Sequence, residues 1–369
     1  MKYYLKNLFL IFGFISVMQA CTAFSGDEPL TEDELASASK VGMNTELLSE
    51  LKGKPLYEFS ELEVDKYLGY LQVQIPDLRE RINFLAHKNI GQEYDIYLLG
   101  EFPFEVYDEQ PLYCLEQSDC VVFSEHTYAM ALSHDWKSFM AMLQRIRYKD
   151  GVISFTTRNH YTEADWIVNN SWLIKDMTID LAGENTKYVN SMINKTNFFR
   201  RNGLDYATPE IDLNWNYIPA EFVKSVIGEL KTGDFVNVVR GSSPENVYVG
   251  HVGLISVDKD GTVYFIHSTS PEVKKQTLVS YMEQSLQLSE KRKIENAEIT
   301  KENEKIKAEN EKLRAKNGGQ PHPDEERLVS QKPYFFGFKF LRLQENAMDN
   351  LRAIDGPDAP KLTIYGGFQ

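Results

Sequence analysis

The chain has 369 residues, 42% of them hydrophobic and 12% aromatic, which is enough to bury one full-sized core with additional segments. Its formal net charge of -14 excludes nucleic acid and anionic membrane surfaces as partners, because such polyanions would repel it. Three cysteines are too few for a disulfide scaffold.

The first twenty residues have the pattern of a secretory signal peptide (1–20), with Lys2 and Lys6 ahead of an apolar stretch over residues 8–17. That stretch is too short to span a bilayer. Cys21 follows directly, as in a bacterial lipoprotein cleavage site, and a plain secreted protein is the alternative. We therefore expect an exported protein of the cell envelope, periplasmic or outer-membrane-anchored, that meets the membrane only through a lipid on Cys21.

The next segments predict a tether followed by helices. Residues 21–50 are small, acidic and weakly periodic, which predicts a tether rather than a packed element. Residues 51–282 predict the main folded domain. Between Leu62 and Leu85 apolar residues recur at helical spacing, and Pro76 interrupts them, so we expect two helices that break at Ile75–Pro76.

A cysteine lies at the predicted start of a helix. Ser118 and Asp119 are favourable N-cap residues, and the apolar spacing that follows places Cys120 in the first helical turn. The helix N-terminus and a neighbouring imidazolium would lower the pKa of such a thiol and favour a nucleophilic thiolate. An inert core cysteine is the alternative, as is a disulfide between Cys114 and Cys120, which would silence the thiol.

Two histidines lie at the outer ends of a predicted hairpin. An apolar run begins at His251, a turn follows at residues 258–261, and a second apolar run ends at His267. Antiparallel pairing would bring the two rings together as a base and its orienter. With the strand that begins near Phe235 and another over residues 338–341, the hairpin predicts a small antiparallel sheet packed on the cysteine helix, an α+β architecture.

These residues resemble a known family. The Asp-Cys-x-x-Phe of residues 119–123, the His-Val-Gly of 251–253 and the Ile-His-Ser of 266–268 look like the NlpC-type papain-fold cysteine hydrolases of bacterial cell walls. The AmiA-like N-acetylmuramoyl-L-alanine amidase family is a closer match. Its further motifs are present at Phe123 with Glu125, at Ile146 to Gly151, at Arg158 to Tyr161, and at Asp165 with Trp166. The resemblance covers about residues 75–280 and 337–340, and departs from the family at Ser118 and Val121, where Leu and Thr are expected.

The resemblance implies a papain-like cysteine hydrolase in which Cys120 is the nucleophile, His251 the general base and acid, and His267 the orienter. The implied substrate is peptidoglycan or its muropeptides, cut at the amide between N-acetylmuramic acid and L-Ala, with no cofactor and no metal. Two alternatives stay open. One is a D,L-endopeptidase that cuts γ-D-Glu to diamino acid bonds, and the other is a non-catalytic envelope lipoprotein that binds wall fragments.

An aromatic and polar cluster between residues 158 and 172 supplies candidates for substrate binding. A glycopeptide needs aromatic faces for its sugars and a few placed polar partners. The candidates are Arg158, His160, Tyr161, Asp165 and Trp166. An arginine in this cluster could pair with a peptide carboxylate. A surface loop with buried aromatic anchors is the alternative.

Residues 283–330 predict a charged helical insertion before the chain returns to the main domain over residues 331–369. Asparagines recur every seven residues at 296, 303, 310 and 317. One interpretation is a weak coiled coil, in which Asn specifies pairing and residues 290–317 self-associate. The other is a single long solvated helix that projects from the sheet.

Overall fold

The computed structural model describes residues 29–101, 110–354 and the backbone of residue 355. The predicted signal peptide and the predicted lipid-bearing Cys21 lie outside the described residues. Among the described residues, no helix combines the length and the apolar character needed to cross a membrane.

The segment predicted as a tether is partly helical. Helices α1 (Glu32–Lys40) and α2 (Thr45–Gly53) pack against α3 (Glu61–Gln74), and Ala38, Leu48 and Leu51 are buried there. Thr31 and Glu34 form a capping box at the start of α1, a Thr-x-x-Glu signal that was present in the sequence. Residues 32–50 therefore belong to the folded body, because their few apolar side chains find a partner surface on α3.

The helix break at Pro76 is confirmed. Helix α3 ends at Gln74, and α4 (Leu78–Lys88) begins after Asp77, whose carboxylate accepts a hydrogen bond from the Glu80 backbone N–H. Residues 120–147 form two further helices, α5 (Cys120–Ala131) and α6 (Trp136–Arg147).

The predicted hairpin is part of a larger sheet than expected. Ten strands of the described residues join in the order β2-β1-β9-β8-β7-β6-β10-β5-β4, with β3 beside β10. Their bounds are β1 Glu93–Tyr94, β2 Gln117–Ser118, β3 Ile174–Asp176, β4 Lys187–Ile193, β5 Ile211–Pro219, β6 Phe235–Ser243, β7 Asn246–Val257, β8 Val263–Thr269, β9 Glu272–Thr277 and β10 Tyr334–Leu343. Every pairing is antiparallel except that of β1 with β2.

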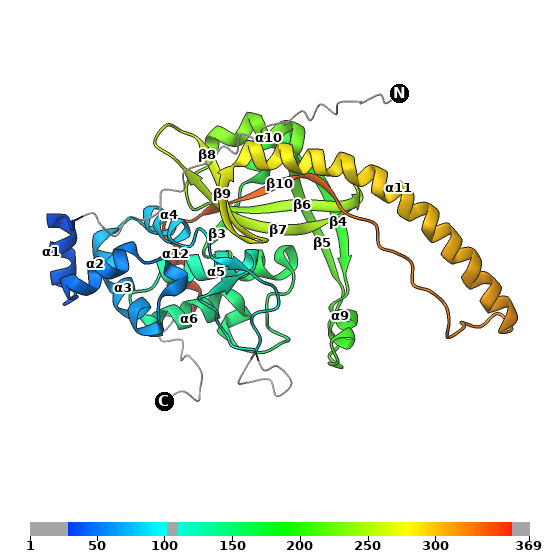
Figure 1. The fold of residues 1–369 in the computed structure, drawn as a ribbon, viewed down its shortest axis with the longest axis horizontal. Helices are drawn as coiled ribbons and strands as arrows, with labels where there is room; N and C mark the ends of the chain where they lie inside the picture. Colours follow the sequence, from blue (N-terminus) through cyan, green and yellow to red (C-terminus); the bar gives the residue numbers. More distant parts are fainter. Residues whose placement is uncertain (1–28, 102–109, 356–369) are drawn as a thin grey trace, which may run out of the picture.

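Helices cover both faces of the sheet (Figure 1). Helices α5 and α6 lie on one face, where Phe235, Leu254 and Ile266 join the main core. On the other face α10 (Ala220–Val226) and the start of α11 (Leu278–Lys316) cover Val238, Phe265 and Phe338. The α+β class is confirmed. The remaining helices are the short α7 (Ile167–Asn169), α8 (Thr178–Ala182), α9 (Lys195–Arg201) and α12 (Ala347–Asp355).

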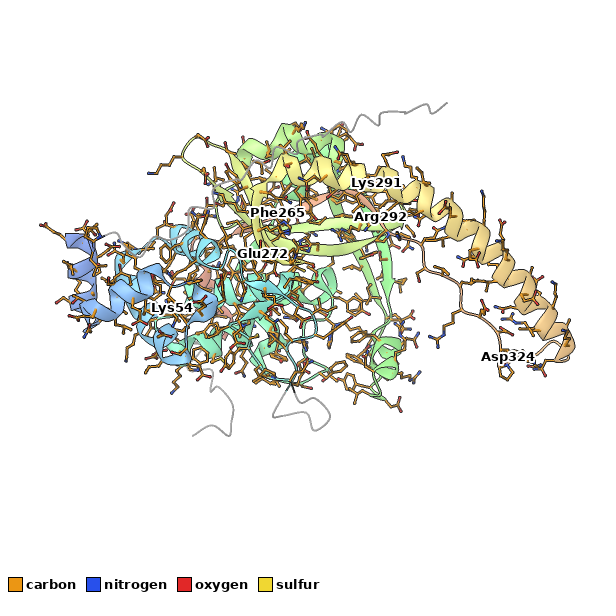
Figure 2. The ribbon with its side chains drawn as sticks, viewed as in Figure 1. Lys54, Phe265, Glu272, Lys291, Arg292 and Asp324 are labelled. Atoms are coloured by element: carbon orange, nitrogen blue, oxygen red, sulfur yellow. The ribbon has the colours of Figure 1, made fainter. Side chains whose placement is uncertain are left out.

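The charged insertion is one long helix with a return segment beside it. Helix α11 starts in the core at Leu278 and projects well beyond the body, and Asp324 lies at the far end of this arm (Figure 2). The chain then runs back to β10, which inserts between β6 and β5. The return through residues 334–343 is therefore confirmed.

The heptad asparagines bind the return segment of the same chain. Each asparagine side chain forms two hydrogen bonds with the backbone of one residue in the return segment: it donates to that residue's carbonyl and accepts from its N–H. The pairs are Asn296 with Lys332, Asn303 with Val329 and Asn310 with Glu326, and the distances are 2.8 to 3.0 Å. Seven helical residues rise about 10.5 Å, and three extended residues span about 9 to 10 Å. Because these two lengths match, asparagines seven residues apart on α11 meet residues three apart on the return segment. We call this arrangement the asparagine ladder.

Replacing Asn303 by alanine should loosen the arm without unfolding the body. Two hydrogen bonds to Val329 are lost, and each contributes about 0.5 to 1.5 kcal/mol, so residues 320–332 should exchange amide hydrogens about 10-fold faster. Hydrogen exchange followed by mass spectrometry measures this. Lys301→Ala, an exposed change within the same turn, is the control and should leave the exchange unchanged. Equal exchange in the two variants would contradict the ladder.

Candidate active site at the start of α5

Cys120 is the first residue of α5, as predicted. The Asp119 side chain caps the helix, since its Oδ1 accepts from the backbone N–H groups of Val121 and Val122 at 2.8 Å each. These two donors are consumed by the cap. The backbone N–H of Cys120 lies close to the sulfur of the same residue. In the first turn of α5 this N–H remains available to stabilise a developing oxyanion.

The sulfur of Cys120 lies where strands β7 and β8 move apart. Strand β7 pairs with β8 only from Leu254 to Val257, so the backbone N–H of Val252 has no partner in β8. This N–H donates to the Cys120 sulfur instead. Because Val252 follows His251 directly, the contact brings the start of α5 beside the first predicted histidine.

The two histidines form a hydrogen-bonded pair. His251 Nε2 and His267 Nδ1 are 2.8 Å apart, as the hairpin geometry predicted, and the Nε2 of His267 lies 3.3 Å from the side-chain amide of Gln276 on β9. His251 thus uses Nε2 for its neighbour, which leaves Nδ1 for a reacting group. His251 and Cys120 are each partly exposed, whereas His267 is buried.

Aromatic rings and one glycine fix the histidine pair in place. The Phe265 ring, which is labelled in Figure 2, stacks on His267 with centroids 4.5 Å apart, and Tyr281 of α11 meets His267 edge-on at 5.2 Å. A Cβ on Gly253 would lie 2.6 Å from the Ile266 carbonyl oxygen and 2.8 Å from the His267 Cβ. The Gly in His-Val-Gly therefore provides the space that His267 occupies.

The electrostatic balance differs from the predicted thiolate. Burial, followed by the Asp119 carboxylate, raises the pKa of the Cys120 thiol to about 12, although the Val252 N–H and Arg240 act in the opposite direction. Burial, then the neighbouring His267 and Arg240, lowers the pKa of His251 well below its usual value. Burial, with Lys274 and Arg240, lowers that of His267 to about 3. These shifts favour a thiol and two neutral imidazoles in the substrate-free site, because desolvation outweighs the helix terminus.

The disulfide alternative is not present in the structure. The described cysteines, Cys114 and Cys120, both carry free thiols. The sulfur of Cys120 is thus available to a substrate.

Two of the predicted substrate contacts are buried. Trp166 is 2% exposed, stacks on Phe235 at 4.6 Å and donates its indole N–H to Glu125. Asp165 is also buried and pairs with Lys195 of α9. Their contact with substrate stays a prediction, and in this structure the Trp166 ring and the Asp165 carboxylate are occupied by partners within the protein.

The other three candidates lie in different surroundings. Arg158 donates to the Leu99 carbonyl at 2.9 Å and pairs with Glu101 at 3.2 Å, so its guanidinium is already matched with a carboxylate.

The other two candidates, His160 and Tyr161, belong to an aromatic cluster. His160 packs on Phe155 and Phe198 of α9, burial lowers its pKa to about 4, and Tyr161 meets Phe198 edge-on. Tyr161 keeps a partly exposed ring.

Sequence reasoning missed three side chains that the fold brings to the histidine pair, namely Arg240, Gln276 and Tyr281. Arg240 ends an apolar run of β6, and a lone charge in such a run was the one available signal. Gln276 and Tyr281 carried no signal, because their relation to the histidines depends on how β9 and α11 pack.

The family model described as AmiA-like, N-acetylmuramoyl-L-alanine amidase-like, matches residues 85–288, about 55% of the chain. The chain belongs to this family. The matched range contains Cys120, His251 and His267, and ends within α11. Among curated proteins, no match to the chain was found.

Two solved structures resemble this AmiA-like protein. Protein LPG0564 from Legionella pneumophila is 18% identical, with a TM-score of 0.56 over 76% of this chain and 94% of the other. An N-acetylmuramoyl-L-alanine amidase from Bacteroides uniformis is 18% identical, with a TM-score of 0.47 over 72% of this chain and 99% of the other. The first similarity supports the fold alone.

Proposed function

We propose that this AmiA-like protein is a cysteine hydrolase of peptidoglycan that cuts the amide between N-acetylmuramic acid and L-Ala. One observation carries the proposal. His251 and His267 form a hydrogen-bonded pair, and the Cys120 sulfur accepts from the backbone N–H of Val252, the residue that follows His251. A nucleophile, a base and an orienter are the parts that acyl transfer through a thiol requires.

In the proposed reaction the Cys120 sulfur attacks the amide carbonyl while His251 Nδ1 takes the thiol proton. Because the resting groups are neutral, this proton moves as the carbon–sulfur bond forms. The Cys120 N–H holds the oxyanion, His251 returns the proton to the leaving amine, and water hydrolyses the thioester. For Nδ1 to accept, His251 Nε2–H must donate to His267 Nδ1, so His267 carries its own proton on Nε2. The Gln276 amide must then turn, so that its oxygen takes the place of the nitrogen that lies 3.3 Å from His267 Nε2 in this structure.

Analysis of the released products tests the proposal. Incubation of purified peptidoglycan sacculi with the protein should release stem peptides that begin with a free L-Ala amino terminus, identified by mass spectrometry. Fragments cut between γ-D-Glu and the diamino acid would instead assign the endopeptidase alternative. Binding of sacculi without any release would favour the non-catalytic lipoprotein.

The pH dependence should extend unusually far into acid. His251 must be neutral to act as a base, and burial, His267 and Arg240 lower its pKa. The Tyr281 ring also stacks on the His251 ring. An ordinary histidine, with a pKa of about 6.5, would be only about 3% neutral at pH 5. We expect kcat/KM to stay within about 2-fold between pH 8 and pH 5 and to fall only below that range.

The fold must be monitored in the same experiment. When the protein unfolds, its buried neutral histidines become exposed and bind protons at an ordinary pKa. The free energy of unfolding therefore decreases as pH falls below about 6.5. Circular dichroism at each pH separates loss of fold from loss of a base. A rate midpoint near pH 6.5 with an intact fold would contradict the proposed environment of His251.

We further propose that the protein is exported and anchored through a lipid on Cys21. The support is the charged and apolar pattern of residues 1–20 and the cysteine that follows them. Metabolic labelling with a fatty-acid analogue should label the full chain and not a Cys21→Ser variant. Labelling that persists in the variant would contradict the anchor site.

A further inference from the structure

Arg240 is a charged side chain near the histidine pair, since its charge lowers the pKa of both His251 and His267. Its aliphatic portion crosses Gly250 of β7, because a Cβ on that glycine would lie 2.8 Å from the Arg240 Cδ. Its guanidinium then reaches Tyr281 of α11, with Nη2 donating to the tyrosine oxygen at 3.2 Å. Contacts with β7 and α11 therefore hold this cation near the histidine pair, because Tyr281 also meets His267 edge-on.

No carboxylate of the described residues pairs with Arg240, and Tyr281 is a neutral partner. Two other half-buried arginines do have acidic partners, Arg79 with Asp234 and Arg158 with Glu101. A partly buried guanidinium without an anion is an uncompensated charge. A ligand that brings its own anion would supply the missing partner.

The charge of Arg240 acts on the reacting groups themselves. It disfavours protonation of His251 and His267 and favours ionisation of Cys120, which places the guanidinium within electrostatic range of all three. An anion held by Arg240 would therefore lie in the neighbourhood of the reacting groups. Arg240 is itself partly exposed, so a bound substrate can reach it.

We propose that Arg240, oriented by Tyr281, binds the α-carboxylate of the D-Glu residue in the stem peptide. This inference rests on the proposed function. The α-carboxylate is the first anionic group beyond the scissile amide, five bonds from the L-Ala nitrogen, or about 6 Å along an extended chain. A guanidinium offers paired N–H donors that match a carboxylate.

Binding of this carboxylate would also prepare the base. Neutralising Arg240 removes one of the charges that disfavour a protonated His251, so the imidazole becomes a better proton acceptor once substrate is seated. A stem that lacks the charge would be bound less tightly and also leave the base less effective.

The test uses two muramoyl tripeptides that differ only at the second residue, which is D-Glu in one and D-isoglutamine in the other. The wild type should hydrolyse the acid with a kcat/KM about 10- to 100-fold higher than that of the amide. Arg240→Gln should lose that factor on the acid and change within about 3-fold on the amide. Arg327→Gln, an exposed change on the return segment of the arm, is the matched control.

If Arg240→Gln lowers kcat/KM equally on both substrates, the inference is overturned, because Arg240 would then act only through the histidines or the fold. A wild type that cuts both substrates equally would overturn it as well, and would leave the proposed function standing.

A binding measurement separates the inference from the proposed function. In a Cys120→Ala background, calorimetry should show about 10-fold tighter binding of the acid than of the amide, and the difference should vanish when Arg240→Gln is added. This outcome supports the subsite even if no hydrolysis of sacculi is found. Equal affinity for both tripeptides, or no binding of either, would overturn the subsite.

Discussion

Replacing Cys120 by alanine is expected to lower kcat/KM for muropeptide hydrolysis by about 10³-fold or more. Of the two described cysteines, Cys120 is the one at the start of a helix, and its sulfur accepts from the N–H of Val252, which follows His251. Alanine removes the nucleophile while keeping the Asp119 cap, because Asp119 bonds to the backbone N–H groups of the two following residues. Initial rates on a purified muropeptide measure the effect.

Cys114→Ala is the matched control for this prediction. Cys114 is the other free thiol of the described residues and lies six positions before Cys120. It lines a small enclosed space with Gln92, Phe123 and His126, behind the first turns of α5 rather than against the histidine pair. This variant should keep at least about half of the activity. Hydrolysis that survives in Cys120→Ala would refute the cysteine mechanism.

Replacing Glu125 by alanine is expected to destabilise the protein by about 3 to 5 kcal/mol. Glu125 and Arg147 form a fully buried pair at 3.2 Å, with side-chain exposures of 4% and 3%, and the second Glu125 oxygen accepts from the Trp166 indole. Burial raises the pKa of Glu125, while Arg147 and Arg158 oppose this shift. Removing the carboxylate leaves the buried Arg147 charge and the Trp166 N–H without their partner.

Urea denaturation followed by fluorescence measures the loss, and an exposed ion pair supplies the control. Glu309 and Lys312 lie 3.0 Å apart on α11, with side-chain exposures of 66% and 68%. Glu309→Ala should change the free energy of unfolding by less than about 0.5 kcal/mol. If Glu125→Ala costs no more than Glu309→Ala, the buried pair does not hold α5, α6 and the Trp166 segment together.

Local sequence determined the parts of the site that are built within one element or one turn. The Asp119 cap sets the start of α5 at Cys120, and a short turn between two apolar runs sets His251 opposite His267. These outcomes depend on hydrogen bonds and pairings between near neighbours, so capping and alternation were sufficient to predict them.

Side chains with two possible destinations could not be assigned in this way. Trp166 resembled a sugar platform but is buried against Phe235, which lies almost seventy positions later on β6. The heptad asparagines resembled a coiled-coil seam but bind the chain's own return segment. In both cases the sequence specified a side chain that requires a partner, and only the packing of distant elements decided which partner it met.

By itself, then, the sequence determined the family motifs, the position of Cys120 in a helical first turn and the pairing of the two histidines. Only the tertiary structure brought Arg240, Gln276 and Tyr281 to that pair, and only the tertiary structure produced a neutral resting thiol. The reason is physical. Helix caps and hairpins are settled by neighbouring residues, whereas desolvation and long-range charge depend on what the whole fold places around a group.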